Sequence, residues 1–191
     1  MDVRDTRIPE VKVIVPKRFG DERGWFTETW NAERYAQAGI DAAWIQDNHS
    51  FSAARGVVRG LHFQIPPDAQ DKLVRCTRGR VLDVAVDIRA GSPTYGQHAA
   101  AELTASGGEQ IFVPRGFAHG FCTLEENCEV QYKVSGRYAP EHDRGIRWDD
   151  ADLDIAWPEE LRSGAWQAQL SGKDAALPGF ADLPEYFTYE Q

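Results

Sequence analysis

Cysteine, histidine and long apolar stretches are scarce in this chain of 191 residues. Its three cysteines, Cys76, Cys122 and Cys128, show no CxxC spacing, so neither a disulfide framework nor a zinc site is predicted. Cys76 and Cys122 lie in apolar runs, and we expect them in the core. No apolar run approaches about 18 residues and the N-terminus lacks a signal-like pattern. These absences predict a cytoplasmic protein without a membrane partner.

The 30 acidic residues outnumber the 21 lysines and arginines, which gives a net charge of −9. Phosphate backbones attract basic surfaces, so a nucleic-acid partner is not expected. A small phosphorylated ligand remains open, because it needs only a few well-placed cations. The length and a hydrophobic content of 42% fit one domain over residues 1–191. We expect a core over about 45–150, N-terminal strands and a short helix in 1–44, and a C-terminal extension over 151–191.

Helix signals are few, whereas strand signals recur. Residues 31–39 predict a short helix with Asn31 as N-cap and Gly39 as its end, and 158–170 could hold another turn or two. Residues 71–77 and 80–88 predict a hairpin that turns at Gly79. Further strands are expected at 111–113, 121–124 and 129–134. This pattern favours an antiparallel sandwich or barrel, of which a jelly roll is the two-sheet form.

The strand over 80–88 has two distinct faces. Leu82, Val84, Val86 and Ile88 share one face; Val81, Asp83, Ala85 and Asp87 share the other. A buried carboxylate is costly unless it is paired or hydrated. Asp83 therefore either points to solvent or lines a wet pocket, where it would meet a cation such as Lys72.

His62 and His119 each lie in an apolar stretch punctuated by glycine. Imidazole is readily tuned to move protons near neutral pH, so each is a candidate base, although a lone histidine is often a core residue. Histidine-rich jelly rolls bind metals through His-x-His on one strand. Gln64 stands where the second histidine would be, so we predict no metal.

Removal of a proton next to a carbonyl needs a base, an acid and a fixed charge beside the developing enolate oxygen. His62, Tyr132 and Lys72 are suitable types, although Lys72 could equally be an exposed lysine at a strand end. The segment 21–26 combines arginine with aromatic rings, which suits a nucleotide diphosphate and base. A charged turn with a buried tryptophan explains it equally well.

Together these segments resemble the dTDP-4-dehydrorhamnose 3,5-epimerase family over nearly the whole chain. The matching motifs keep a family-like order and spacing. They are FGDERGWF at 19–26, QDNHS at 46–50, VRGLHFQ at 58–64, KLVRC at 72–76, DVAVDIR at 83–89, SPTYG at 92–96, VPRGFAHGF at 113–121, YK at 132–133, GIRWDD at 145–150 and LSGKD at 170–174.

The resemblance implies an all-β, cupin-type double-stranded β-helix (jelly roll) with short flanking helices. It also implies a homodimer that exchanges strands, and no cofactor. The implied reaction inverts C3 and C5 of dTDP-4-dehydro-6-deoxy-D-glucose to give dTDP-4-dehydro-L-rhamnose. Both carbons flank the C4 ketone, so one enolate chemistry serves twice.

The resemblance also assigns roles to residues. His62 is the base, Asp174 orients it, Lys72 stabilises the enolate oxygen and Tyr132 delivers a proton from the opposite face. The implied substrate-binding residues are Arg23, Phe26, Glu28, Gln46, Asn48, Arg59, His119, Asp143 and Lys173.

Two departures from the family pattern concern ligand binding. Arg137-Tyr138 replaces a frequent Tyr-Tyr pair, and Glu141 rivals Asp143 as the acidic ligand contact. Three other functions stay open: an epimerase acting at C3 or C5 alone in another deoxysugar pathway, a metal-dependent cupin enzyme, and a non-catalytic sugar-nucleotide-binding module.

Overall fold

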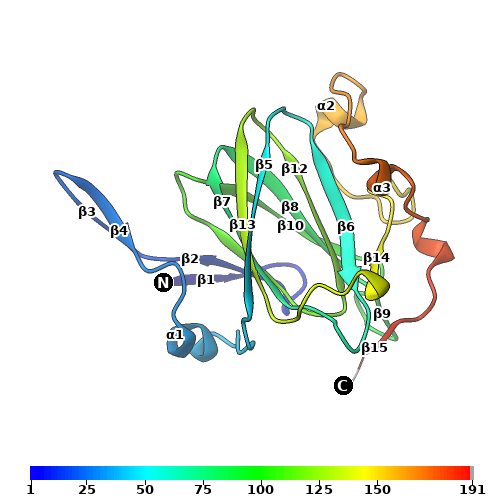
Figure 1. Ribbon diagram of the computed structural model, residues 1–191, viewed down its shortest axis with the longest axis horizontal. Coiled ribbons are helices and arrows are strands. Elements are labelled where there is room, and N and C mark those ends of the chain that lie inside the picture. The colour runs from blue at the N-terminus through cyan, green and yellow to red at the C-terminus, as the bar shows by residue number, and fades with distance from the viewer. Residues whose placement is uncertain (190–191) are drawn as a thin grey trace.

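Two large antiparallel sheets face each other in this computed structural model, which describes residues 1–189 (Figure 1). The first has the strand order β1 (Asp2–Asp5), β2 (Lys12–Val15), β11 (Gln110–Val113), β7 (Lys72–Arg78), β13 (Cys128–Val134) and β5 (Gln46–Ser52). The second has the order β10 (His98–Thr104), β8 (Arg80–Asp87), β12 (Phe117–Thr123), β6 (Val58–Gln64) and β14 (Asp143–Gly145). The predicted cupin-type jelly roll is confirmed.

The smaller elements lie outside these sheets. β3 (Arg18–Asp21) and β4 (Gly24–Thr27) form a hairpin, and β9 (Arg89–Ala90) pairs in parallel with β15 (Phe187–Thr188). The short helices are α1 (Ala32–Gln37), α2 (Glu159–Arg162) and α3 (Gly172–Ala175), with 3-10 turns at Pro140–His142 and Phe180–Asp182. Within the described residues, none of the helices is long and apolar enough to span a membrane.

The predicted start and end signals of helix α1, Asn31 and Gly39, both act as expected. The side chain of Asn31 accepts a hydrogen bond from the backbone N–H of Arg34, which caps α1. Gly39 follows the helix with φ 79°, a conformation that suits glycine at a helix end. The buried Tyr35 attaches α1 to the outer face of the first sheet, next to Ile14 and Phe112.

The predicted hairpin over residues 71–88 is wrong, although both of its strands exist. β7 pairs with β11 and β13, whereas β8 pairs with β10 and β12 in the opposite sheet. Gly79, with φ 76°, therefore turns the chain from one sheet into the other. A glycine turn between alternating strands looks the same in sequence whether the strands pair edge to edge or face each other across a core.

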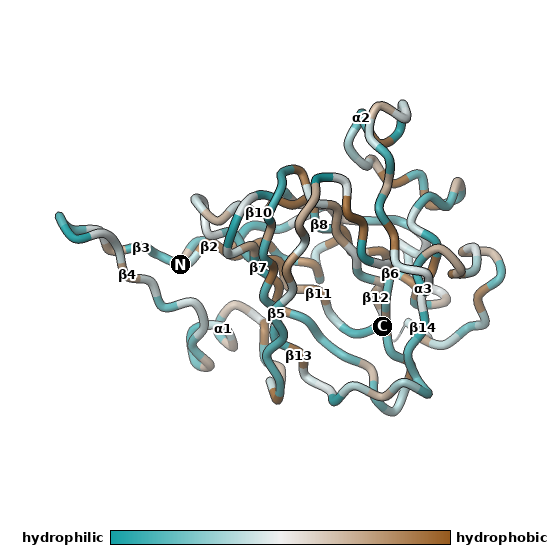
Figure 2. Tube along the Cα trace, turned by 45° about the horizontal axis from the view of Figure 1, so that its top comes forward, coloured by the Kyte–Doolittle hydropathy of each residue, from teal (hydrophilic) through white to brown (hydrophobic). Residues whose placement is uncertain are grey.

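Apolar side chains fill the space between the sheets and also cover the outside of the second sheet. Val74, Ala85 and Phe121 belong to the inner core. Val84 and Val86, on the other face of β8, pack with residues of the C-terminal segment such as Trp157. All three cysteines are free and buried, so the prediction for Cys76 and Cys122 is confirmed. Figure 2 shows apolar residues along the strands of both sheets and a hydrophilic tip on the β3–β4 hairpin.

Candidate active site

One site cavity lies between the two sheets and has an inner and an outer part. The inner part measures about 260 Å³ and the outer part about 420 Å³. His62, Lys72, Tyr132 and Lys173 line both parts. His62 lies on β6 of the second sheet, whereas Lys72 and Tyr132 lie on β7 and β13 of the first. The site therefore combines side chains from both walls of the jelly roll.

His62 forms a pair with Asp174. Its Nε2 lies 2.5 Å from Asp174 Oδ1, and the Asp174 carboxylate is buried. Burial alone would raise the pKa of Asp174, but the hydrogen bond from His62 and its positive charge outweigh burial, and the pKa is lowered. The Ser171 hydroxyl caps α3 by accepting from the Asp174 N–H at 3.0 Å, which fixes the carboxylate. With Nε2 donating to Asp174, Nδ1 is the basic nitrogen.

Lys72 brings a cation to the same place. Its ammonium group is nearly buried and donates to the backbone carbonyl of His62 at 3.2 Å. Burial lowers the pKa of Lys72 to about 8, while the charges of Asp83 and Asp143 act in the opposite direction. The alternative of an exposed lysine at a strand end is wrong. Because the charge is poorly solvated, it interacts strongly with any oxygen that gains negative charge nearby.

Asp83 faces the interior, so its predicted position at solvent is wrong; it lines neither part of the cavity, and its direct partner is His119 and not Lys72. Its carboxylate is fully buried, and both oxygens lie 3.0 Å from His119 Nε2. Burial lowers the pKa of His119, and the Asp83 charge opposes this. His119 is the β-ladder partner of His62, next to a bulge where Gly60 has φ 125°. A Cβ on Gly60 would lie 2.5 Å from Gly120 Cα, so only glycine allows β6 and β12 to approach this closely.

Tyr132 and Arg59 complete the inner part. Burial raises the pKa of Tyr132, with a smaller opposing effect of the Arg59 charge, so the phenol stays protonated at neutral pH. The Arg59 guanidinium donates to Ser52 Oγ at 3.2 Å and to the Phe51 carbonyl at 3.0 Å. Ser50 and Phe121 also line this part; both lie in the matching motifs, but nothing in the sequence marks them as site residues.

The outer part contains four of the residues predicted for ligand binding, Gln46, Asn48, Asp143 and Lys173. Gln46 donates to Asn48 at 2.7 Å, and Lys173 forms an ion pair with Asp143. Asp143 lines the cavity, whereas its rival Glu141 is exposed and does not. Tyr138 also lines it and donates to Asp143 Oδ2 at 3.1 Å. From the sequence, Tyr138 is only part of a departure from the family pattern and is not predicted to bind ligand.

Comparisons with known proteins identify the family of the chain. A model of the family described as dTDP-4-dehydrorhamnose 3,5-epimerase matches residues 5–182. The chain belongs to this family. A dTDP-4-dehydrorhamnose 3,5-epimerase of Sinorhizobium fredii is 50% identical over 95% of this chain and 91% of its own. The dTDP-4-dehydrorhamnose 3,5-epimerase of Shigella flexneri is 45% identical over 98% of this chain and 99% of its own.

A solved structure of an epimerase in this family is also similar. The dTDP-6-deoxy-D-glucose-3,5-epimerase of Legionella pneumophila, crystallised with dTDP-4-keto-L-rhamnose, superposes with a TM-score of 0.92. It is 41% identical to this chain, and the match covers 100% of this chain and 99% of that one.

Three ligand-binding residues expected from the epimerase family lie away from the site cavity. Arg23, Phe26 and Glu28 line neither part of it. Arg23 pairs with Asp21, and the hairpin that carries Arg23 and Phe26 projects from the body of the molecule (Figure 1). The alternative of a buried tryptophan in this segment is wrong, because Trp25 is 60% exposed.

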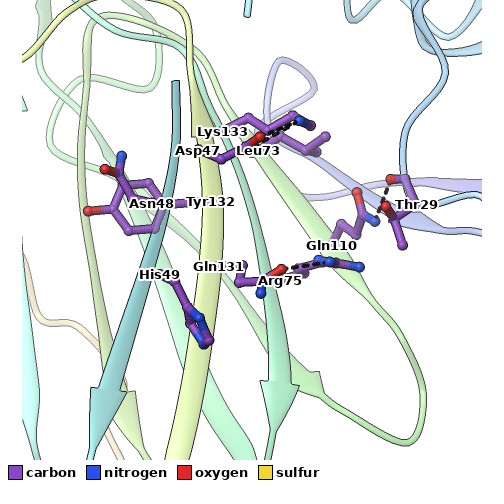
Figure 3. Close-up of a pocket in the computed structure, with 10 residues that line it drawn as sticks. All are labelled: Thr29, Asp47, Asn48, His49, Leu73, Arg75, Gln110, Gln131, Tyr132 and Lys133. Carbon is purple, nitrogen blue, oxygen red and sulfur yellow. Dashed lines mark hydrogen bonds and ion pairs between the residues drawn. The ribbon is translucent and has the colours of Figure 1, made fainter. Parts of the chain in front are cut away.

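A separate cavity of about 320 Å³ lies on the outer face of the first sheet (Figure 3). Its cationic side chains have partners within it: Lys133 forms an ion pair with Asp47, and Arg75 donates to the amide oxygen of Gln131. Tyr132 and Asn48 border it but lie on the other side of β13 and β5 (Figure 3). His62 and Asp174 do not contribute to this cavity, so it is separate from the site cavity.

Proposed function

We propose that this protein is a dTDP-4-dehydrorhamnose 3,5-epimerase. It would convert dTDP-4-dehydro-6-deoxy-D-glucose to dTDP-4-dehydro-L-rhamnose by inverting C3 and C5. The observation that carries this proposal is the grouping of the His62–Asp174 pair, the Lys72 ammonium and the Tyr132 phenol around one cavity. This grouping supplies a base, a cation and an acid, which proton abstraction next to a ketone requires.

In the proposed mechanism His62 removes the proton from C3 or C5, and Asp174 stabilises the imidazolium that forms. The electron pair moves onto the C4 oxygen, where Lys72 balances the enolate charge. Tyr132 then donates a proton to the opposite face of the carbon, which inverts it. The proton on His62 and the one lost by Tyr132 exchange with solvent before the second carbon reacts. No cofactor is needed, since no electrons leave the sugar.

The cations lining the site cavity support a phosphorylated ligand in a protein of net charge −9. Arg59 and Lys173 are suitably placed for the diphosphate, while Gln46, Asn48, Asp143 and His119 supply polar contacts. We place the reaction in the cytoplasm, where the three free thiols would remain reduced.

The experiment that tests the function is turnover in deuterated water. A 3,5-epimerase should give a product that carries deuterium at both C3 and C5, as read by proton NMR. Deuterium at only one carbon would replace the proposal with a single-site epimerase. Binding of dTDP without any exchange would indicate a non-catalytic sugar-nucleotide-binding module.

Deprotonation of Lys72 should control how kcat/KM depends on pH on the alkaline side. Its pKa of about 8 lies below the ordinary lysine value because of burial. The ammonium is present below that pH and is lost above it, so kcat/KM should fall as pH rises through about 8. Measuring kcat/KM between pH 6 and 10 checks this. A profile that stays flat to the alkaline end would remove Lys72 from the role of enolate stabiliser.

We also propose that the active form is a homodimer in which the β3–β4 hairpin of one subunit reaches the site cavity of its partner. Phe19, Trp25 and Phe26 are all more than half exposed on this hairpin, and a group of exposed apolar side chains marks an interaction surface. This arrangement would bring Arg23, Phe26 and Glu28 to a ligand that they do not reach within their own chain.

Subunit mixing tests this arrangement. Dimers formed from equal amounts of His62→Asn and Arg23→Ala chains should recover about a quarter of the parental activity, because half of the dimers contain one intact site. Each variant alone should be weak at a substrate concentration below the KM of the Arg23→Ala protein. If mixing restores nothing, the hairpin does not act across the dimer.

A further inference from the structure

Gln64 lies two residues after the base on β6, and its side chain is 4% exposed. All the hydrogen-bonding groups of its amide are used. Nε2 donates to the backbone carbonyls of Asp68 at 2.7 Å and Arg137 at 2.9 Å, and Oε1 accepts from the Ala139 N–H at 2.7 Å. The residue that replaces a second metal-binding histidine is therefore engaged entirely with the backbone.

The partners of Gln64 lie on two different loops. Residues 65–71 connect β6 to β7, and residues 135–142 connect β13 to β14. The loops also contact each other: Gln70 donates to the Gly136 carbonyl at 2.7 Å, and the Asp68 carboxylate meets His142 Nδ1 at 2.8 Å. A Cβ on Gly136 would lie 3.2 Å from the Asp68 carbonyl, so the two backbones are closely packed. Gln64 forms the buried centre of this contact.

The second loop leads to the outer wall of the site cavity. Tyr138 lies between Arg137 and Ala139, whose backbones both bond to Gln64. The Tyr138 side chain is 58% exposed, and its hydroxyl reaches Asp143. Such a side chain depends on its backbone for its position, because little else packs around it.

We propose that Gln64 is a positioning residue for nucleotide binding, acting through Tyr138. The amide fixes the backbone on both sides of Tyr138, so that the ring and Asp143 form part of the wall of the outer part, which Gln64 also borders. This inference rests on the proposed function and adds to it a residue that sets affinity for the nucleotide without taking part in proton transfer.

The sharpest test is Gln64→Glu, which keeps the shape and the acceptor for the Ala139 N–H. Its second oxygen would face the carbonyls of Asp68 and Arg137, and a buried acceptor without a donor is costly. We expect the Kd for dTDP, measured by calorimetry, and the KM to rise about 10-fold, with kcat changed less than about 2-fold. The matched control Gln97→Glu makes the same chemical change at an exposed residue outside the cavity and should leave all three values unchanged. If Gln64→Glu does not fold, Gln64→Asn, whose shorter amide cannot reach both loops, should show the same pattern.

Repeating the Gln64→Glu substitution in a protein that lacks the Tyr138 ring separates a positioning role from a structural one. In a Tyr138→Ala protein, Gln64→Glu should change the Kd for dTDP less than about 2-fold. A lower melting temperature with unchanged dTDP affinity would overturn the proposal, as would an equal fall in kcat. A parent that binds dTDP without turnover would refute the proposed function and leave this test usable; a parent that does not bind dTDP would refute both.

Discussion

His62→Asn should lower kcat by about 10⁴-fold, the upper range for loss of a general base. An asparagine amide cannot accept the proton from carbon. The shorter asparagine places its amide near the position of Nδ1 and not of Nε2, so Asp174 loses this hydrogen bond as well. The cations that line the site cavity are unchanged, and we expect the Kd for dTDP to stay within about 3-fold. A coupled assay of ketosugar conversion and calorimetry with dTDP measure the two quantities.

His49→Asn is the matched control for this substitution. His49 lies on the outer face of the first sheet, where it pairs with Glu129 at 3.0 Å. The same chemical change there should leave kcat unaltered. If His62→Asn kept more than a few per cent of the parental rate, another group would have to remove the proton.

Tyr132→Phe should separate the two halves of the reaction. Deprotonation by His62 needs no phenol, so exchange of the first substrate hydrogen with deuterated water should continue at a rate within about 10-fold of the parent. Inversion needs a donor on the opposite face, and product formation should fall about 10³-fold. Proton NMR of substrate and product during one incubation measures both rates.

Tyr95→Phe provides the corresponding control, because this tyrosine packs on Phe180 outside the site cavity. It should behave as the parent in both measurements. An equal loss of exchange and inversion in Tyr132→Phe would mean that the phenol orients the sugar and does not supply the proton.

The sequence predicted the strands better than their partners. Alternation along 80–88 correctly separated the two faces of β8, because burial has a period of two in a strand. It could not show that β7 and β8 belong to opposite sheets, since pairing depends on distant segments. The strand expected at 121–124 begins earlier, at Phe117. The run 117–123 is buried on both faces, so it lacks the alternation that would have marked its start.

The site residues differed in the same way. Local patterns identified His62, Lys72 and Tyr132 as suitable chemical types. Asp174 lies 112 positions from His62 in the chain, so only the family resemblance connected the two residues. The sequence shows Gln64 only in place of a metal-binding histidine, because its bonds to two loops depend on backbone positions that composition and spacing do not encode. The hairpin residues Arg23 and Phe26 cannot be placed at a ligand from one chain alone.

The reacting groups of this protein come from two facing sheets, with the base on one and the ammonium and phenol on the other. The separation between acid and base is therefore the thickness of the apolar layer that holds the sheets apart. A close-packed interior transmits a change of one methylene to its surroundings, and a misplacement of about 1 Å can cost 10²-fold in rate. Substitutions at remote positions such as Val74 could thus slow proton transfer while the protein remains well folded.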